Sequence, residues 1–187
     1  TPTDYVSNGG FEKGSLTGWT TGGTVGWSAT QAAGDVLTGA WGARSGDIAD
    51  SQTSSLSRAV TVPAGGAWLT FDYWLDSEDD YDYADVYVAG QRRWLVAKDT
   101  GWSSARLWLN PGTQTITWTY RKDSADSEGR DAFGLDNVFV STYAWSASIP
   151  VGSDSTSAQF TVPGQVSENG AVRIRALYGG KASEWVT

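Results

Sequence analysis

The sequence predicts an all-β protein of the sandwich or barrel type. Helical periodicity is almost absent along the 187 residues, and short runs instead alternate apolar with polar side chains. Clusters of Gly, Pro, Asn and Asp separate these runs, as turns separate the strands of a sandwich or barrel. Hydrophobic residues make up 40% of the chain, which is enough for one domain of ordinary size to bury a core.

Seven alternating runs are expected to form the main strands, with turn signals such as Pro63–Gly66 and Asn110–Gly112 between them. The predicted strands are Leu56–Val62, Ala67–Leu75, Ala84–Ala89, Arg93–Ala97, Ala105–Leu109, Thr113–Arg121 and Phe133–Ser141. A change in composition near Ser141 divides the chain into a sandwich domain, residues 1–141, and a small β segment, residues 142–187. In that segment, strands are expected at Tyr143–Ile149, Ser157–Val162 and Ala171–Leu177.

Alternation also assigns the two faces of each predicted strand, because successive side chains point to opposite sides of a sheet. One face of each strand is plainly apolar, and the side chains expected between two sheets are Leu69, Phe71, Tyr73, Leu75, Val86, Val88, Leu107, Leu109, Ile116 and Trp118. The opposite faces mix aromatic rings with charged and hydroxyl groups. A solvated face that carries several aromatic rings suggests stacking on a ligand.

Composition excludes several classes of partner and chemistry. The net charge of −8 and the pI of about 4.4 describe a surface that repels phosphate backbones, so no nucleic-acid partner is expected. No apolar run approaches the ~20 residues that span a bilayer, so no membrane insertion is expected. Histidine and cysteine are both absent, which removes the usual neutral-pH base and any disulfide. No signal peptide or initiator Met is visible, so the sequence is interpreted as a mature or excised piece of a longer precursor.

The eleven tryptophans and eight tyrosines favour a binding protein over a catalyst. Trp is a large, stiff, amphipathic ring that suits surfaces which hold other molecules, and one core does not easily absorb eleven. A platform for a polysaccharide or other glycan is predicted from three rings, Trp74, Tyr87 and Trp108. The polar neighbours expected to bind sugar hydroxyls are Asp72, Asp85 and Arg106.

Several motifs together resemble known bacterial modules. Asn8-Gly9-Gly10-Phe11-Glu12 followed by Thr17-Gly18-Trp19 resembles the opening of many bacterial carbohydrate-binding jelly rolls. The stretches Ala43–Leu56, Tyr81-Asp82-Tyr83, Trp118–Asp123 and Gly134–Val138 resemble the MAM-like jelly rolls of bacterial surface proteins and secreted enzymes. The resemblance covers about residues 5–141. It implies an antiparallel two-sheet jelly-roll β-sandwich, and such modules bind polysaccharide, mediate adhesion or space other domains.

The resemblance also implies a structural calcium ion. Its acidic ligands match Glu12, near the first strand, and Asp136, near the last, which lie side by side if the terminal strands pair. Ca²⁺ takes six to eight hard oxygen ligands from carboxylates and carbonyls. The alternative interpretation is a turn glutamate and a surface aspartate. A denser acidic loop at Asp76–Asp85 does not match the EF-hand pattern, and it is interpreted as a solvated hairpin loop rather than a metal site.

Individual tryptophans are assigned by face and by the resemblance. Trp19, Trp102 and Trp118 are expected in the core, whereas Trp27 and Trp41 fall in long early loops and are expected at a rim. Paired carboxylates invite a glycosidase hypothesis, but the 21 acidic residues make chance pairs common, and no motif singles out a catalytic acid. The protein is therefore expected not to be an enzyme.

The C-terminal segment resembles the closing strands of a fibronectin type III domain, through Ala171–Leu177 and Ala182–Trp185. Its strands are expected to form a partial domain, pack on the sandwich or pair with a neighbouring protein. Two functional hypotheses follow. The first is a non-catalytic carbohydrate-binding or adhesion module of a secreted or surface bacterial protein, located outside the cell. The second is a structural assembly protein, such as a surface-layer, fibre or virion component, built on the same jelly roll.

Overall fold

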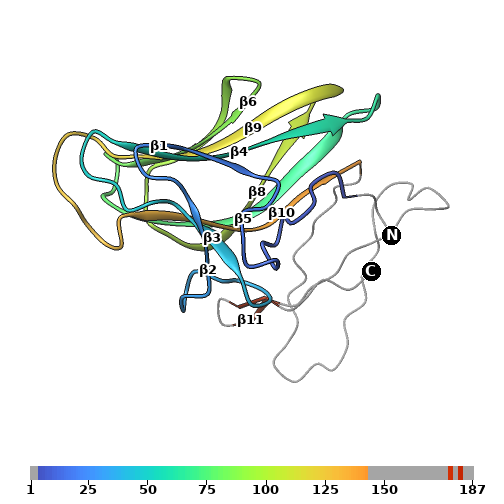
Figure 1. Ribbon diagram of the computed structural model, residues 1–187. Coiled ribbons are helices and arrows are strands. Elements are labelled where there is room, and N and C mark those ends of the chain that lie inside the picture. The colour runs from blue at the N-terminus through green and yellow to red at the C-terminus, as the bar shows by residue number, and fades with distance from the viewer. Residues whose placement is uncertain (1–3, 143–176, 179–180, 183–187) are drawn as a thin grey trace.

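The computed structural model describes residues 4–142, 177–178 and 181–182. It contains two five-stranded antiparallel sheets stacked as a sandwich (Figure 1). Sheet A has the strand order β1 (Thr20–Gly23), β4 (Thr53–Val62), β9 (Gly112–Arg121), β6 (Tyr83–Val88) and β7 (Gln91–Val96). Sheet B has the order β2 (Ser28–Thr30), β3 (Gly42–Arg44), β10 (Ala132–Ser141), β5 (Ala67–Asp76) and β8 (Thr100–Leu109). The prediction of an all-β jelly-roll sandwich is confirmed.

A short hairpin, β11 (Leu177–Tyr178) with β12 (Lys181–Ala182), follows the sandwich. Within the described residues there is no helix, and so none that could cross a membrane. The predicted strands Tyr143–Ile149 and Ser157–Val162 lie outside the described residues. The predicted strand Ala171–Leu177 enters them only at its last residue, which begins β11.

The seven main strands form where alternation predicts them, although several are longer. β8 begins at Thr100, five residues before its predicted start, because its first half is rich in Gly and Ser and shows no apolar alternation. β1, β2 and β3 were not predicted, since runs of three or four residues with at most one alanine as an apolar position are too short to show a period of two.

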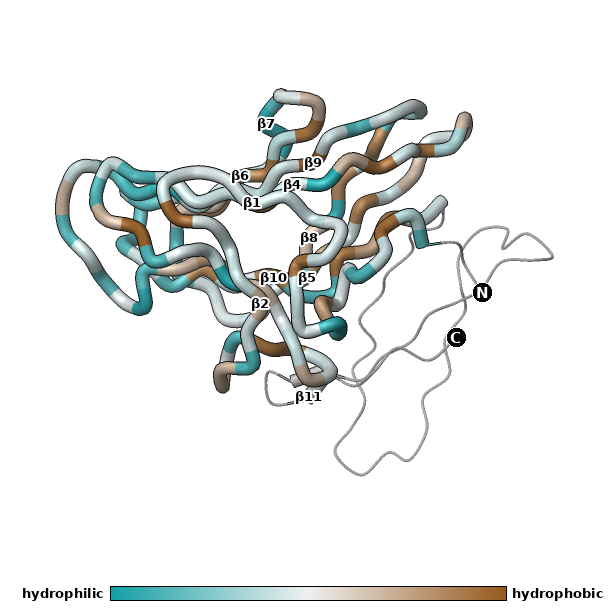
Figure 2. The backbone as a smooth tube through the Cα atoms, viewed as in Figure 1, coloured by the Kyte–Doolittle hydropathy of each residue, from teal (hydrophilic) through white to brown (hydrophobic). Residues whose placement is uncertain are grey.

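The core lies between the two sheets, where the apolar faces of the strands meet. Figure 2 shows hydrophobic residues concentrated along the strands and hydrophilic ones in the loops at the left of the view. Eight of the ten predicted core side chains are buried, while Tyr73 and Leu107 are half-buried against the core. Trp118 lies at the centre, edge-on to Phe71 at 5.7 Å and to Trp19 at 5.6 Å between ring centroids.

Nine of the eleven tryptophans lie among the described residues, and they divide into two groups. Trp19, Trp27 and Trp118 are buried in the core, and Trp41 and Trp94 pack partly against it. The prediction that Trp27 lies at a rim is wrong, because its ring is buried in the core, edge-on to Phe133 at 5.3 Å. The remaining four are Trp68, Trp74, Trp102 and Trp108, which lie on β5 and β8 in sheet B and are absent from the core cluster.

Candidate functional site

The six predicted ligand-binding residues lie on two opposite surfaces of the sandwich. β5 and β8 belong to sheet B, so Asp72, Trp74, Arg106 and Trp108 lie on its outer face. β6 belongs to sheet A, so Asp85 and Tyr87 lie on the outer face of that sheet. The prediction of one platform containing Trp74, Tyr87 and Trp108 is therefore wrong: strands that follow one another along the chain lie in different sheets.

Asp85 is engaged within the protein and not presented to a ligand. Its carboxylate is fully buried, accepts a hydrogen bond from Nε of Arg121 at 2.7 Å and pairs with Arg92 at 3.6 Å. The Arg121 guanidinium lies over the Tyr83 ring, 3.9 Å from its centroid. A buried carboxylate needs such partners to remain charged, so this cluster stabilises the outer face of sheet A.

Asp72, the predicted polar partner on sheet B, is also buried and serves as a link between strands. It accepts a hydrogen bond from the Ser104 hydroxyl of β8 at 2.5 Å and another from the Asn137 amide of β10 at 2.9 Å. One carboxylate thereby joins three neighbouring strands of sheet B.

Two aromatic rings meet at one end of this face, beside a β-bulge. Tyr73 pairs with Ser103 but Leu75 pairs with Thr100, so Gly101 and Trp102 both lie opposite Trp74. Trp102 shares the face of Ser104, Arg106 and Trp108 by simple alternation, and its ring stands edge-on to Trp74 at 6.5 Å between centroids. The prediction that Trp102 belongs to the core is wrong, since it is half-buried on the outer face.

Trp74 forms the floor of this site and is not an exposed platform. Its side chain is only 2% exposed, and the Arg130 guanidinium lies 3.7 Å from the centroid of its ring. On its other side the ring lies against the backbone of β10 at Gly134, where any larger residue would collide with the indole. The prediction that Trp74 is a surface residue is wrong because Arg130 and Trp102 cover it.

A pocket of about 400 Å³ opens beside these rings. Its lining residues come from the β2–β3 loop, β5, β8 with its preceding loop, and the β9–β10 loop: Gly34, Trp74, Leu75, Asp76, Asp99, Thr100, Gly101, Trp102 and Arg130. An aromatic wall with a few charged and hydroxyl groups is the composition typical of small-molecule sites. Of these residues, only Trp74 was predicted to bind a ligand.

Internal hydrogen bonds hold the polar groups of the pocket in place. Arg130 donates from Nε to Asp76 at 2.8 Å and from Nη1 to the buried Asp35 at 2.6 Å. Asp99 accepts from the backbone N–H of Ser77 at 2.7 Å. The indole N–H of Trp102 donates to the carbonyl of Gly34 at 3.1 Å. Groups fixed in this way lose little conformational entropy when a ligand binds.

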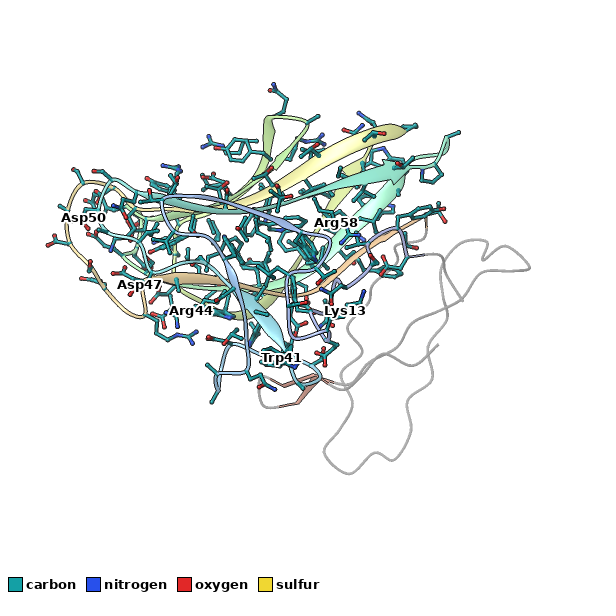
Figure 3. The ribbon with its side chains drawn as sticks, viewed as in Figure 1. Lys13, Trp41, Arg44, Asp47, Asp50 and Arg58 are labelled. Carbon is teal, nitrogen blue, oxygen red and sulfur yellow. The ribbon has the colours of Figure 1, made fainter. Side chains whose placement is uncertain are left out.

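The predicted calcium ligands, Glu12 and Asp136, are both bound to the β2–β3 loop. Glu12 accepts from the backbone N–H groups of Ala40, at 3.0 and 3.2 Å, and of Trp41 at 3.1 Å. Asp136 accepts from those of Leu37 and Thr38, each at 3.0 Å. Figure 3 labels Trp41 at the lower edge of the sandwich. The N-terminal segment runs beside β10, where Tyr5 N–H donates to the Val140 carbonyl and Val138 N–H donates to the Gly9 carbonyl.

The donor chemistry at Glu12 and Asp136 fits a hard cation. Asp136 is fully buried, and its burial raises the pKa of the carboxyl to about 7, although three backbone N–H donors act in the opposite direction. A cation beside it would compensate the buried negative charge that the N–H groups compensate only in part. Both carboxylates flank Gly10, where an added Cβ would lie 3.8 Å from Glu12 Cγ and 4.0 Å from Asp136 Oδ1.

The acidic β5–β6 loop joins strands of different sheets, so the prediction of a hairpin loop is wrong, and the loop is only partly solvated. Asp79 and Asp80 are exposed, but Asp82 is fully buried and lies with Glu78 and Asp123 so that one oxygen of each falls within 4.8 Å of the others. Desolvation and the neighbouring carboxylates raise the pKa of Glu78. Lys122 approaches Asp82 at 4.0 Å, so the protein supplies a cation of its own beside this cluster.

Comparisons with known proteins agree with the fold. No protein-family model matches the sequence, and no curated protein matches it. Among solved structures, TmCBM61 in complex with beta-1,4-galactotriose is 19% identical over 75% of this chain and 99% of that chain, with a TM-score of 0.59. The K1 cleaved adhesin domain of Lys-gingipain from Porphyromonas gingivalis W83 is also 19% identical, over 72% and 96%, with a TM-score of 0.54.

The CBM22-1 xylan-binding domain from Paenibacillus barcinonensis Xyn10C is 15% identical, over 78% of this chain and 98% of that one, with a TM-score of 0.50. These likenesses show that the chain shares the β-sandwich of carbohydrate-binding modules. The predicted resemblance to carbohydrate-binding jelly rolls is thus confirmed for the fold. The MAM-like and fibronectin type III-like resemblances stay predictions.

Proposed function

We propose that the protein is a non-catalytic carbohydrate-binding module that binds a glycan on the outer face of sheet B. The observation that carries the proposal is the pocket in which Trp102 stands beside fixed carboxylate, hydroxyl and guanidinium groups. The fold supports it, because carbohydrate-binding modules with bound galactotriose or named for xylan binding share this sandwich. A location outside the cell or on its surface, and a part in adhesion, belong to the same proposal.

In this proposal a pyranose ring stacks through its C–H groups on the exposed part of Trp102. Asp99, Asp76 and Arg130 then bind its hydroxyl groups. Stacking is the larger contribution, because the polar contacts largely replace contacts with water and net only about 0.5–1.5 kcal/mol each. Asp76 and Asp99 already accept bonds that hold the pocket together, which suits binding better than proton transfer.

We expect Trp102→Ala to weaken glycan binding by roughly 2 kcal/mol, as loss of an aromatic anchor does, which is about a 30-fold rise in Kd. Galactans, xylans and a wider panel of neutral and acidic glycans should be titrated while tryptophan fluorescence is followed. Tyr87→Ala is the matched control, since Tyr87 lies on the opposite surface and its loss should leave Kd unchanged.

Two outcomes would contradict the proposal. Binding that survives Trp102→Ala at full strength would move the site elsewhere on the molecule. If no glycan in the panel binds the correctly folded protein, the hypothesis of a structural assembly protein takes its place.

We further propose that Glu12 and Asp136 hold a structural calcium ion together with carbonyl oxygens of the β2–β3 loop. The ion would supply positive charge that fixes this loop to the N-terminal segment and to β10. The same loop carries Gly34 and Asp35, which position Trp102 and Arg130 in the pocket. Calcium binding to the folded state alone should raise the Tm, and a chelator should lower it.

A further inference from the structure

We propose that the outer face of sheet B carries a second stacking subsite, formed by Trp68, Trp108 and Arg106, and that the protein binds the interior of a linear glycan chain across both subsites. The inference rests on the proposed function and deepens it. It names the class of ligand as an extended polysaccharide segment and excludes a single terminal sugar as the preferred ligand.

The two ends of this face repeat one arrangement of side chains. At the pocket, Trp74 of β5 and Trp102 of β8 meet at an interplanar angle of 81°, and a guanidinium lies over Trp74. At the other end, Trp68 of β5 and Trp108 of β8 meet at 72° with centroids 5.2 Å apart. The Arg106 guanidinium lies over Trp68, 5.2 Å from its centroid. Each end therefore pairs a tryptophan of β5 with one of β8 and places an arginine over the β5 ring, Arg106 of β8 at one end and Arg130 of the β9–β10 loop at the other.

Trp108 is both exposed and held in position. It is 37% exposed, which is unusual for an indole within a strand. One side of the ring contacts Trp68, and another lies so close to Gly66 in the β4–β5 turn that a Cβ there would collide with it. Gly66 has a φ of +78°, so the turn itself requires glycine. An exposed ring that is fixed before binding is suited to stack on a ligand at low entropic cost.

The distance between the two clusters sets the size of the ligand. Trp74 lies six positions after Trp68 on β5, and an antiparallel strand rises about 3.4 Å per residue, so the clusters lie roughly 20 Å apart. No mono- or disaccharide spans that distance, whereas a linear oligosaccharide does. Thr70 of β5, opposite Arg106 of β8, lies in the interval, where its hydroxyl can bind the hydroxyl groups of intervening sugars.

Because one glycan molecule would occupy both subsites of the protein, the affinity should depend on the length of the glycan. Once the first sugar is bound, the second contact is intramolecular and adds affinity without a further loss of translational freedom. Affinity should therefore rise with the number of sugar units until both clusters are covered, and then level off.

The test uses the full chain with β-1,4-galacto-oligosaccharides and xylo-oligosaccharides from disaccharide to octasaccharide, beside the parent polysaccharides, in calorimetric titrations. Trp108→Ala should leave the Kd for the disaccharides within twofold of wild type and weaken the longest ligands about tenfold or more. Arg106→Ala provides a second variant at the same subsite, and Tyr87→Ala on sheet A is the matched aromatic control. A thermal melt of each variant verifies the fold.

Three results would overturn the inference. The first is a wild-type affinity that does not depend on the length of the glycan. The second is an unchanged Kd for the longest ligands in both Trp108→Ala and Arg106→Ala. Failure of every glycan to bind would remove the proposed function and this subsite with it, whereas length-independent binding that needs Trp102 would remove the second subsite alone.

Discussion

Replacing Trp118 with alanine should destabilise the folded protein by about 3–5 kcal/mol. The side chain is fully buried between the sheets and packs edge-on against Phe71 and Trp19. Its removal loses the transfer free energy of the indole and leaves a cavity that the rigid strands of both sheets can fill only in part. Urea unfolding followed by fluorescence should show a lower midpoint with an unchanged slope.

Trp118→Phe separates the contribution of volume from that of the indole N–H. The Nε1 of Trp118 is buried without a hydrogen-bond partner among the described residues, so phenylalanine removes an unsatisfied donor while keeping an aromatic ring. We expect this variant to lose much less stability than the alanine variant. An equal loss of stability in Trp118→Phe and Trp118→Ala would show that the packing around this position does not depend on the volume of the ring.

In calcium-free buffer, the free energy of unfolding contributed by Asp136 should fall as the pH rises from about 4 to about 7. The folded pKa of this carboxyl is raised from 3.8 to about 7, chiefly by burial. Between those values the native state binds more protons than the unfolded state, so stability is lost with increasing pH. The rise of this pKa from 3.8 to about 7 corresponds to a loss of about 4 kcal/mol in the free energy of unfolding across that pH range.

Asp136→Asn isolates this contribution, because it is neutral and of the same size. The stability of the variant minus that of the wild type should increase across this pH range, and Asp47→Asn, at an exposed position labelled in Figure 3, is the matched surface substitution. Added calcium should restore the wild type at high pH and leave Asp136→Asn unaffected. A constant difference for Asp136→Asn, together with a Tm indifferent to calcium and chelator, would contradict both the raised pKa and the metal site.

Side-chain alternation predicts the core correctly because it is a local property of each strand. Leu69, Phe71 and Leu75 face the core together, since a shift of one residue would expose all of them. The sheet to which a strand belongs is not a local property. The chain leaves sheet B after β5 and enters sheet A at β6, and the alternation within each strand carries no information about that crossing.

The candidate site was harder to predict for the same reason. Trp102 lies next to Trp74 because β8 pairs with β5 across sheet B, and Arg130 reaches the site from a loop more than fifty residues further along the chain than Trp74. The available signal was the alternation of β8, since Trp102 falls on the same face as Arg106 and Trp108 once the strand is extended back to Thr100. Asp72 and Asp85 were correctly placed on outer faces, but buried hydrogen bonds and ion pairs engage both of them.

The pairing of the N-terminal segment with β10 bears on how the sandwich can be joined to other proteins. Tyr5 is hydrogen-bonded to Val140, so the chain enters and leaves the sandwich at neighbouring points. A domain with adjacent ends can be inserted into a surface loop of a host protein, or circularly permuted, without separating the parts on either side. The sandwich therefore has the geometry of a domain that can be inserted as a single unit into different proteins.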